Sequence, residues 1–215
     1  HEFAIKYVAE HSNSVMDRAF VWVAFYSGNE GSLLYIVLAL SIMSALAIWF
    51  APRRMERSMP WTIAVLAVVQ LFYFFVMSFF ANPFELLDVI PEEGRGINPL
   101  LTHPGMFSHP PMLMGGLIAI TIPFAFASGA LISGNYGDDW VDVARVSAII
   151  AWGVLGAGML IGAWWAYTIL GWGGYWGWDP IENVALMPWL VLTAFIHSIM
   201  VQKRRGMFRM WNVAL

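Results

Sequence analysis

The chain alternates between long apolar stretches and short polar ones. Five stretches of about 20 residues hold almost no charge, and their apolar positions run on continuously instead of alternating as in a half-buried strand. A helix needs about 20 apolar residues to cross the hydrocarbon core of a bilayer, where it satisfies its own backbone hydrogen bonds. The predicted transmembrane helices are residues 31–50, 61–81, 111–134, 144–168 and 184–202.

These five runs predict the fold class, an all-α, polytopic integral membrane protein. The composition agrees, since 60% of the residues are hydrophobic and 12% are charged, against about 45–50% and 25% in soluble domains. The continuous runs argue against a membrane barrel, whose strands alternate in hydropathy. The net charge of −3 and the absence of a basic face give no indication of nucleic-acid binding.

Lysine and arginine set the predicted orientation. The loop 51–60 and the tail 203–215 are expected in the cytoplasm because they concentrate these residues. The residues concerned are Arg53, Arg54, Arg57, Lys203, Arg204, Arg205 and Arg209. The acidic loop 135–143 falls on the same side, which the rule tolerates because acidic residues count little. Alternation places three segments outside: 1–30, which should form a helix and loop, 82–110, and the tryptophan-rich segment 169–183.

The chain contains no cysteine, which excludes disulfides, thiolate metal sites and a cysteine nucleophile in these residues. It begins with His1 and shows no targeting segment. Residues 207–215 resemble the opening of another apolar segment. We therefore expect a fragment, a split subunit or one part of a longer chain.

The stretch "LGWGGYWGWDPIENVALMPWL" concentrates the candidate chemistry. Its glycines let rings and backbone approach a flat ligand closely, and Asp179 and Glu182 lie among the rings. An interfacial aromatic belt is the alternative, because tryptophan is enriched at headgroup level in membrane proteins. A belt explains neither the acids nor the glycines, whereas a planar amphipathic ligand explains both. The candidate ligand-binding tryptophans are Trp172, Trp176 and Trp178.

Two histidines are candidate ligands. His109 stands where the second external loop meets the third span, and Pro110 and Pro111 are expected to push it toward an extended conformation. It could ligate a metal, haem iron included, or serve as a turn residue. His197 lies inside the fifth span, where an ionisable side chain is a functional candidate by default. Hydrogen-bonded packing is the alternative for His197.

Other polar residues of the external loops are weaker candidates. Arg95, between two glycines, is suited to bidentate binding of carboxylates such as haem propionates. A solvated arginine, or one paired with a neighbouring glutamate, is the alternative. His103 and His11 are expected to be solvated. Since no other histidine lies inside a span, an axial partner for His197 would have to lie outside these residues.

These motifs resemble a known family. "WGGYWGWDPIENVALMPWL" is similar to the tryptophan-rich WWD domain of cytochrome c assembly proteins. Its continuation, "DPIENVALMPWL", resembles the CcmF branch more than the CcmC or CcsA branches. "VAEHSNS", "EGSLL", "GRGINPLL" and "HPPML" are also similar to CcmF, so the resemblance runs from about residue 3 to the end.

The resemblance implies the core membrane subunit of a cytochrome c haem lyase. Its location would be the bacterial cytoplasmic (inner) membrane, with the mitochondrial inner membrane as the alternative, and the WWD segment would face outward. Haem would arrive from the chaperone CcmE, and CcmH and CcmI would present apocytochrome c for thioether attachment. His109 would ligate this substrate haem. His197 would ligate an intramembrane haem b that helps to reduce it, with quinol as the candidate electron donor.

The family pattern is incomplete in this chain. The second external histidine and the second intramembrane histidine have no counterpart here, and no catalytic residue is assigned because the reacting thiols belong to the substrate. Other functions therefore compete with the lyase. They are a haem-presenting scaffold similar to CcmC or CcsA, a quinol-oxidising b-type cytochrome, and a transporter, for which paired charges at mid-membrane are lacking.

Overall fold

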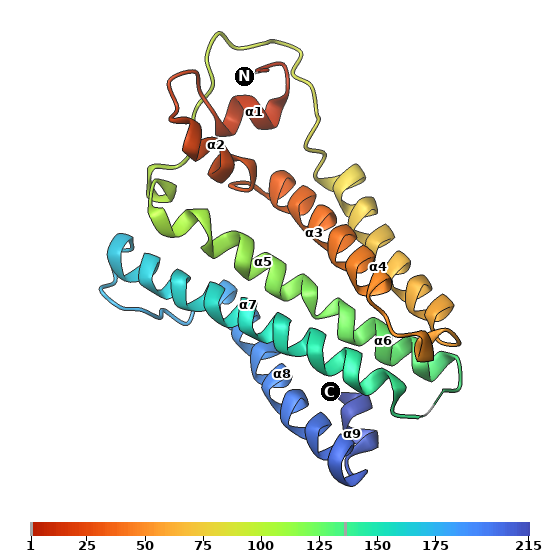
Figure 1. Ribbon diagram of the computed structural model, residues 1–215. Coiled ribbons are helices and arrows are strands. Elements are labelled where there is room, and N and C mark those ends of the chain that lie inside the picture. Colours follow the sequence, from red (N-terminus) through yellow and green to blue (C-terminus); the bar gives the residue numbers. More distant parts are fainter. Residues whose placement is uncertain (1, 136) are drawn as a thin grey trace.

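The computed structural model describes residues 2–135 and 137–215 and confirms an all-α, polytopic membrane protein. Five helical stretches in it are long and apolar enough to cross a membrane. Figure 1 shows α5 and α6 in the middle of the bundle, between the α3–α4 pair and the α7–α8 pair. The stretches are α3 Asn29–Trp49, α4 Met59–Phe80, α5 His109–Ala119 with α6 Thr121–Ile132, α7 Asp139–Ile169 and α8 Pro180–Arg205.

Two helices extend beyond the apolar runs. α7 begins at Asp139, so part of the loop predicted at 135–143 is helical, and α8 begins at Pro180, inside the segment predicted at 169–183. A helix continues its hydrogen bonding into polar residues, whereas hydropathy marks only the residues suited to the hydrocarbon core. The connection between α7 and α8 is therefore short, residues 170–179.

The third predicted span, 111–134, is not one regular helix. α5 ends at Ala119, Ile120 forms the joint, and α6 follows. Pro123 explains the break, because it has no N–H to offer the Ala119 carbonyl and its ring crowds that carbonyl. A short 3₁₀ turn, η3 Pro104–Phe107, precedes α5 in the same apolar stretch.

Glycines bring α5 and α7 into close contact, as small residues do in membrane bundles. A Cβ on Gly116 of α5 would lie 2.6 Å from the backbone of Leu155 in α7. A Cβ on Gly158 of α7 would lie 2.8 Å from the backbone nitrogen of Leu113 in α5. The two backbones therefore approach each other so closely that any side chain at either glycine would force them apart.

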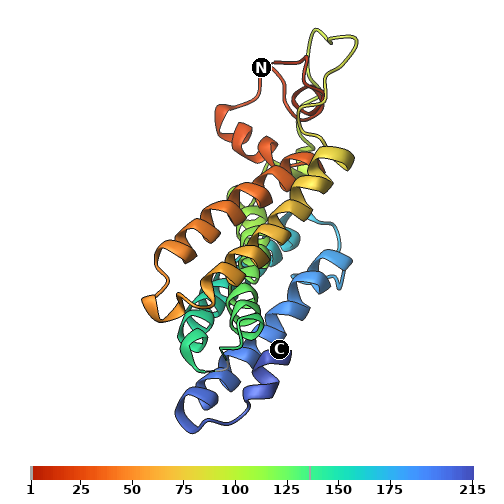
Figure 2. The same cartoon turned by 90° about the vertical axis from the view of Figure 1, so that its right-hand side faces the viewer.

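A cap covers one end of the bundle, where the N-terminal segment meets the connection that follows α4 (Figures 1 and 2). The Lys6 amide donates to the Glu85 carbonyl at 2.9 Å, and the Arg95 amide donates to the Ala9 carbonyl at 2.8 Å. Lys6 Nζ also pairs with the Glu85 carboxylate at 3.0 Å. The cap consists of α1 Lys6–His11, α2 Arg18–Phe25, the segment 82–98 and η2 Pro99–Leu101.

Ion pairs around two aspartates hold the other end. Asp142 accepts hydrogen bonds from Arg54 Nη2 at 2.9 Å and from Lys203 Nζ. Asp138 accepts one from Arg209 Nη2 at 3.3 Å. The tail that resembled the opening of another apolar segment forms the short helix α9 beside α8. The elements joined here are η1 Arg53–Met55, the start of α7, the end of α8, and α9 Arg209–Ala214.

Candidate functional site

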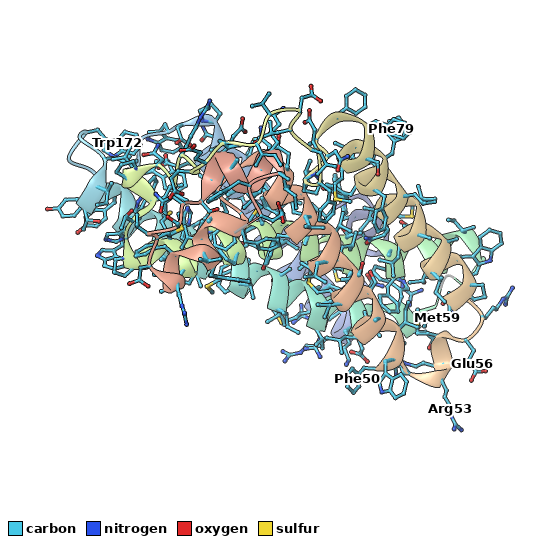
Figure 3. The ribbon with its side chains drawn as sticks, turned by 90° about the horizontal axis from the view of Figure 1, so that it is seen from above. Phe50, Arg53, Glu56, Met59, Phe79 and Trp172 are labelled. Atoms are coloured by element: carbon cyan, nitrogen blue, oxygen red, sulfur yellow. The ribbon has the colours of Figure 1, made fainter. Side chains whose placement is uncertain are left out.

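The candidate site lies at the end of the bundle that carries Trp172, opposite the basic turn at Arg53 (Figure 3). His109 is the first residue of α5, and Pro110 and Pro111 follow it in the first turn. The prediction that His109 has an extended backbone conformation is wrong, because the residue is helical. Prolines suit the first turn of a helix, because an amide there has no intrahelical partner to lose.

The His109 ring is held against α7. Its Nδ1 lies 2.8 Å from the Gly158 carbonyl oxygen, and the ring is nearly parallel to that of Trp165, at 6.2 Å between centroids. The carbonyl can only accept, so Nδ1 donates and Nε2 keeps its lone pair. Gly162 makes room for the ring, since a Cβ there would lie 2.3 Å from His109 Cε1. The imidazole is thus fixed in the tautomer that a metal ligand needs.

The tryptophan segment, residues 170–179, is held largely by its own atoms. Trp172 Nε1 donates to the Gly174 carbonyl at 2.8 Å, and the Trp172 ring covers Gly177, where a Cβ would approach it to 2.9 Å. Trp178 has left-handed backbone, with φ +57°, and is 69% exposed. Such a conformation is strained for a bulky residue and marks a candidate functional position.

The two acidic residues form a helix cap. Asp179 Oδ1 accepts from the Glu182 amide at 2.7 Å, and Glu182 Oε2 accepts from the Asp179 amide at 3.3 Å and from the Gly177 amide at 2.9 Å. This reciprocal arrangement is a capping box at the start of α8, with Pro180 in the first turn. The acids therefore have a structural role that requires no ligand.

A small cavity of about 110 Å³ brings five of the eight predicted site residues together. Trp176 Nε1 is buried in the structure without a hydrogen-bond partner, although buried indole N–H groups usually have one. Nine further residues that the sequence analysis did not indicate line the cavity, among them Gly162 and Trp165, which contact the His109 ring. Gly162 and Trp165 lie on α7 within eight residues of the tryptophan segment, and this proximity is the signal that could have indicated them. The predicted residues that line the cavity are His109, Trp172, Trp176, Asp179 and Glu182.

The other three predicted residues do not line this cavity. The Trp178 ring packs edge-on against Trp176, at 5.9 Å between centroids. Arg95 is exposed in the cap, and its neighbour Glu93 is hydrogen-bonded to Ser14 instead. His197 is exposed on α8, where its Nδ1 lies 2.7 Å from the carbonyl oxygen of residue 193 and therefore donates to it.

In the described part of the chain, the two other external histidines, His11 and His103, are half-buried and hydrogen-bonded. His103 Nδ1 accepts from the Gly105 amide at 3.0 Å, and its Nε2 lies 3.2 Å from the Thr168 hydroxyl. His11 stacks on Tyr7 at 4.2 Å between centroids. Within residues 2–135 and 137–215, no cluster of three or more histidine or acidic residues is arranged to hold a metal ion. A metal ion held here would therefore take at most two histidine or acidic ligands from this part of the chain.

These features define a multi-pass membrane protein with a tryptophan-walled pocket and a fixed imidazole at one end of its bundle. The chain belongs to the cytochrome c assembly protein family, whose profile, described as "Cytochrome C assembly protein", matches residues 26–215. No solved structure matches the chain significantly.

Individual relatives match over the whole length of the chain. It is 39% identical to "Cytochrome c-type biogenesis protein CcmF" of Pseudomonas fluorescens over 215 residues, 100% of this chain and 33% of the relative. The CcmF protein of Escherichia coli K12 is 37% identical over 100% of this chain and 33% of its own length. "Probable cytochrome c-type biogenesis protein NrfE" of the same strain is 37% identical over 100% of this chain and 39% of its own length. The chain thus spans about a third of the length of these relatives.

Proposed function

We propose that the chain forms part of the core membrane subunit of a cytochrome c haem lyase. It would hold haem, the substrate, beside the tryptophan segment on the outer face of the bacterial cytoplasmic membrane. The observation that carries this proposal is the His109 imidazole, held through Nδ1 by Gly158 with Nε2 left as a ligand, in a pocket walled by tryptophans. The CcmF names of the relatives support the same role.

The residues present fit haem in their chemistry. A neutral imidazole is a haem-iron ligand, and indole faces pack on a planar macrocycle. The unpartnered Trp176 N–H can donate to a carboxylate. The cavity is smaller than the roughly 300–1,000 Å³ of small-molecule sites, so binding requires the tryptophan segment to move outward. Gly171 and Gly173 give the segment backbone freedom, and they are uncrowded, because a Cβ at either would meet no atom within 4 Å.

The chain would position the reactants and would not attack them. Thioether formation adds the S–H of a substrate cysteine across a haem vinyl group. Sulfur bonds to one vinyl carbon, the proton goes to the other, and no net oxidation occurs. This addition needs no nucleophile from the lyase, and the chain has no cysteine. Fixing haem and apocytochrome relative to each other is therefore the contribution asked of these residues.

His197 is the candidate axial ligand of a resident haem b. Its Nδ1 is engaged with the carbonyl of residue 193, and the exposed ring leaves Nε2 available at the surface of α8. When bound, haem b would supply the electron that keeps the substrate iron reduced, with quinol as the donor. The remaining partners in this proposal are CcmE as haem donor, CcmH and CcmI as apocytochrome carriers, and apocytochrome c itself.

Optical spectra of the purified full-length protein test the proposal. His109→Ala should lower the haem retained at the external site at least tenfold and leave the b-type spectrum, whereas His197→Ala should do the reverse. His11→Asn, a change to another external histidine, should leave both signals. Loss of both signals in His109→Ala would show that this histidine stabilises the fold instead of binding haem. Unchanged haem content in His109→Ala would exclude the pocket as the haem site.

A further inference from the structure

The bundle has a larger, apolar groove near the end opposite the tryptophan segment. Its volume is about 510 Å³, within the roughly 300–1,000 Å³ typical of ligand sites. α3 forms one wall and α7 the other, while Ala119 and Ile122, both buried, form the floor where α5 meets α6. The apolar wall residues are Met43, Leu46, Ala47, Phe50, Val143, Val146 and Ile150.

The groove contains almost no polar group that could hold water. The Ser147 hydroxyl donates to the Val143 carbonyl at 2.7 Å. Both oxygens of Asp142 are engaged, one by Arg54 and the other by Lys203. From Asp142 to Ile150 the α7 wall rises about 12 Å, at 1.5 Å per residue. The groove is therefore largely apolar and long enough for several methylene groups of a hydrocarbon chain.

Three arginines lie at or beside the mouth of the groove, where Asp142 is the one acidic lining residue. Arg54 lines the groove, and its guanidinium has five donors, of which one is used on Asp142. Arg53 and Arg57 are exposed in the same turn, where Glu56 is the single acid (Figure 3 labels Arg53 and Glu56). A guanidinium is well matched to phosphate oxygens, and basic pockets between transmembrane helices bind anionic headgroups. An apolar channel ending at such a cluster complements a molecule with a hydrocarbon tail and an anionic head.

We propose that this groove binds one acyl chain of an anionic phospholipid, whose phosphate contacts Arg54. The site is separate from the tryptophan pocket, because the two lie at opposite ends of the bundle and share no lining residue. It does not depend on the haem-lyase proposal. Phospholipid binding here would fill the space between α3 and α7 and stabilise the end of the bundle at which η1, α7 and α8 are joined by ion pairs.

Native mass spectrometry of the full chain with added lipid tests the headgroup contact. Phosphatidylglycerol should bind at least tenfold more tightly than phosphatidylcholine with the same acyl chains, and Arg54→Gln should abolish this preference. Lys203→Gln is the matched control, because Lys203 pairs with the same Asp142 carboxylate but does not line the groove. Equal binding of the two lipids by the unmodified chain, or an undiminished preference in Arg54→Gln, overturns the proposal.

A second variant tests the acyl-chain channel. Val146→Trp should fill the groove and weaken phosphatidylglycerol binding at least tenfold. Leu160→Trp, on an exposed part of the same helix that does not line the groove, should leave it unchanged. Circular dichroism should show the same helix content in both variants as in the unmodified protein. Unchanged binding in Val146→Trp, or a protein helix cross-linked to residue 146 in membranes in place of lipid, would show that the groove has another occupant.

Discussion

At the scale of single residues, the absence of one methyl group decides where the His109 ring lies. Gly162 faces the ring so closely that a Cβ would stand 2.3 Å from Cε1, and the Gly158 carbonyl fixes Nδ1 from the same helix. Both glycines belong to α7, whereas the histidine begins α5. The orientation of the candidate ligand therefore depends on two residues that are themselves unable to bind anything through a side chain.

Gly162→Ala should push the His109 ring out of place and break its hydrogen bond to Gly158. Overpacking of this kind costs about 1–3 kcal/mol, and external haem should fall as it does in His109→Ala. Gly153→Ala on the same helix is the control, because a Cβ there meets no atom within 4 Å. It should be neutral or stabilising by up to about 1 kcal/mol. Unfolding in SDS and the haem spectrum measure the two effects, and equal behaviour of the variants would contradict the packing argument.

Asp179 allows the cap and a charge-dependent role to be separated. Asp179→Ala removes the cap and should lower stability by about 1 kcal/mol, whereas Asp179→Ser keeps an N-cap oxygen and should cost much less. If the carboxylate only caps α8, haem retention in Asp179→Ser should equal that of the unmodified protein. A serine variant that is stable but loses haem would instead mean that the charge itself contacts the ligand.

At the scale of elements, the sequence predicts the spans well because hydropathy is a property of each residue in turn. The joint at Ile120 could also have been predicted, since Pro123 lies in the third apolar run. The capping box could have been predicted as well, because Asp179 and Glu182 have the spacing and the intervening proline of a helix start. The position of the His109 ring could not have been predicted, because it depends on which helix packs against α5. That contact links residues 49 positions apart and leaves no local pattern.

The pairing of the cap segments should weaken in acid. Hydrogen bonds from the Ser14 hydroxyl, and then from the Ser14 and Gly94 amides, hold the pKa of Glu93 below its usual value. A carboxyl with a lowered folded-state pKa stabilises the fold above the unfolded pKa of about 4.3, and this stabilisation is lost as the pH falls through the folded value. Hydrogen exchange in residues 12–16, corrected for the intrinsic rate, should accelerate below about pH 4.3.

The control for this acid effect lies next to Glu93 in the chain. Glu93→Gln should make exchange in residues 12–16 much less dependent on pH. Glu92→Gln changes an exposed neighbour and should leave the pH dependence as it is. An acid response that persists in Glu93→Gln would assign the effect to another carboxyl group.

At the scale of the whole molecule, the candidate haem site and the basic end lie far apart along the bundle (Figure 3). The positive-inside rule then predicts which end faces the cytoplasm. The absence of cysteine makes the prediction easy to test, because any introduced thiol is the only one in this part of the protein.

Val15→Cys and Met210→Cys place thiols at residues that are 87% and 82% exposed, in the link between α1 and α2 and in α9. A membrane-impermeant maleimide should label residue 15 in intact spheroplasts and residue 210 only after permeabilisation. Labelling with the opposite pattern would place the tryptophan pocket in the cytoplasm. That result would contradict an outer-face haem site even if His109 were shown to bind haem.

The cap also has a consequence for the order in which the protein is made. Ser14 meets Glu93, its hydrogen-bond partner, 79 residues later in the chain. At about 5–20 residues per second, a ribosome takes about 4–16 s to cover that distance. During this interval α3 and α4 must both insert into the membrane, because two spans are needed to return the chain to the side on which α1 lies. The cap therefore cannot close until α3 and α4 have inserted, and its N-terminal half is open to chaperones and proteases during that interval.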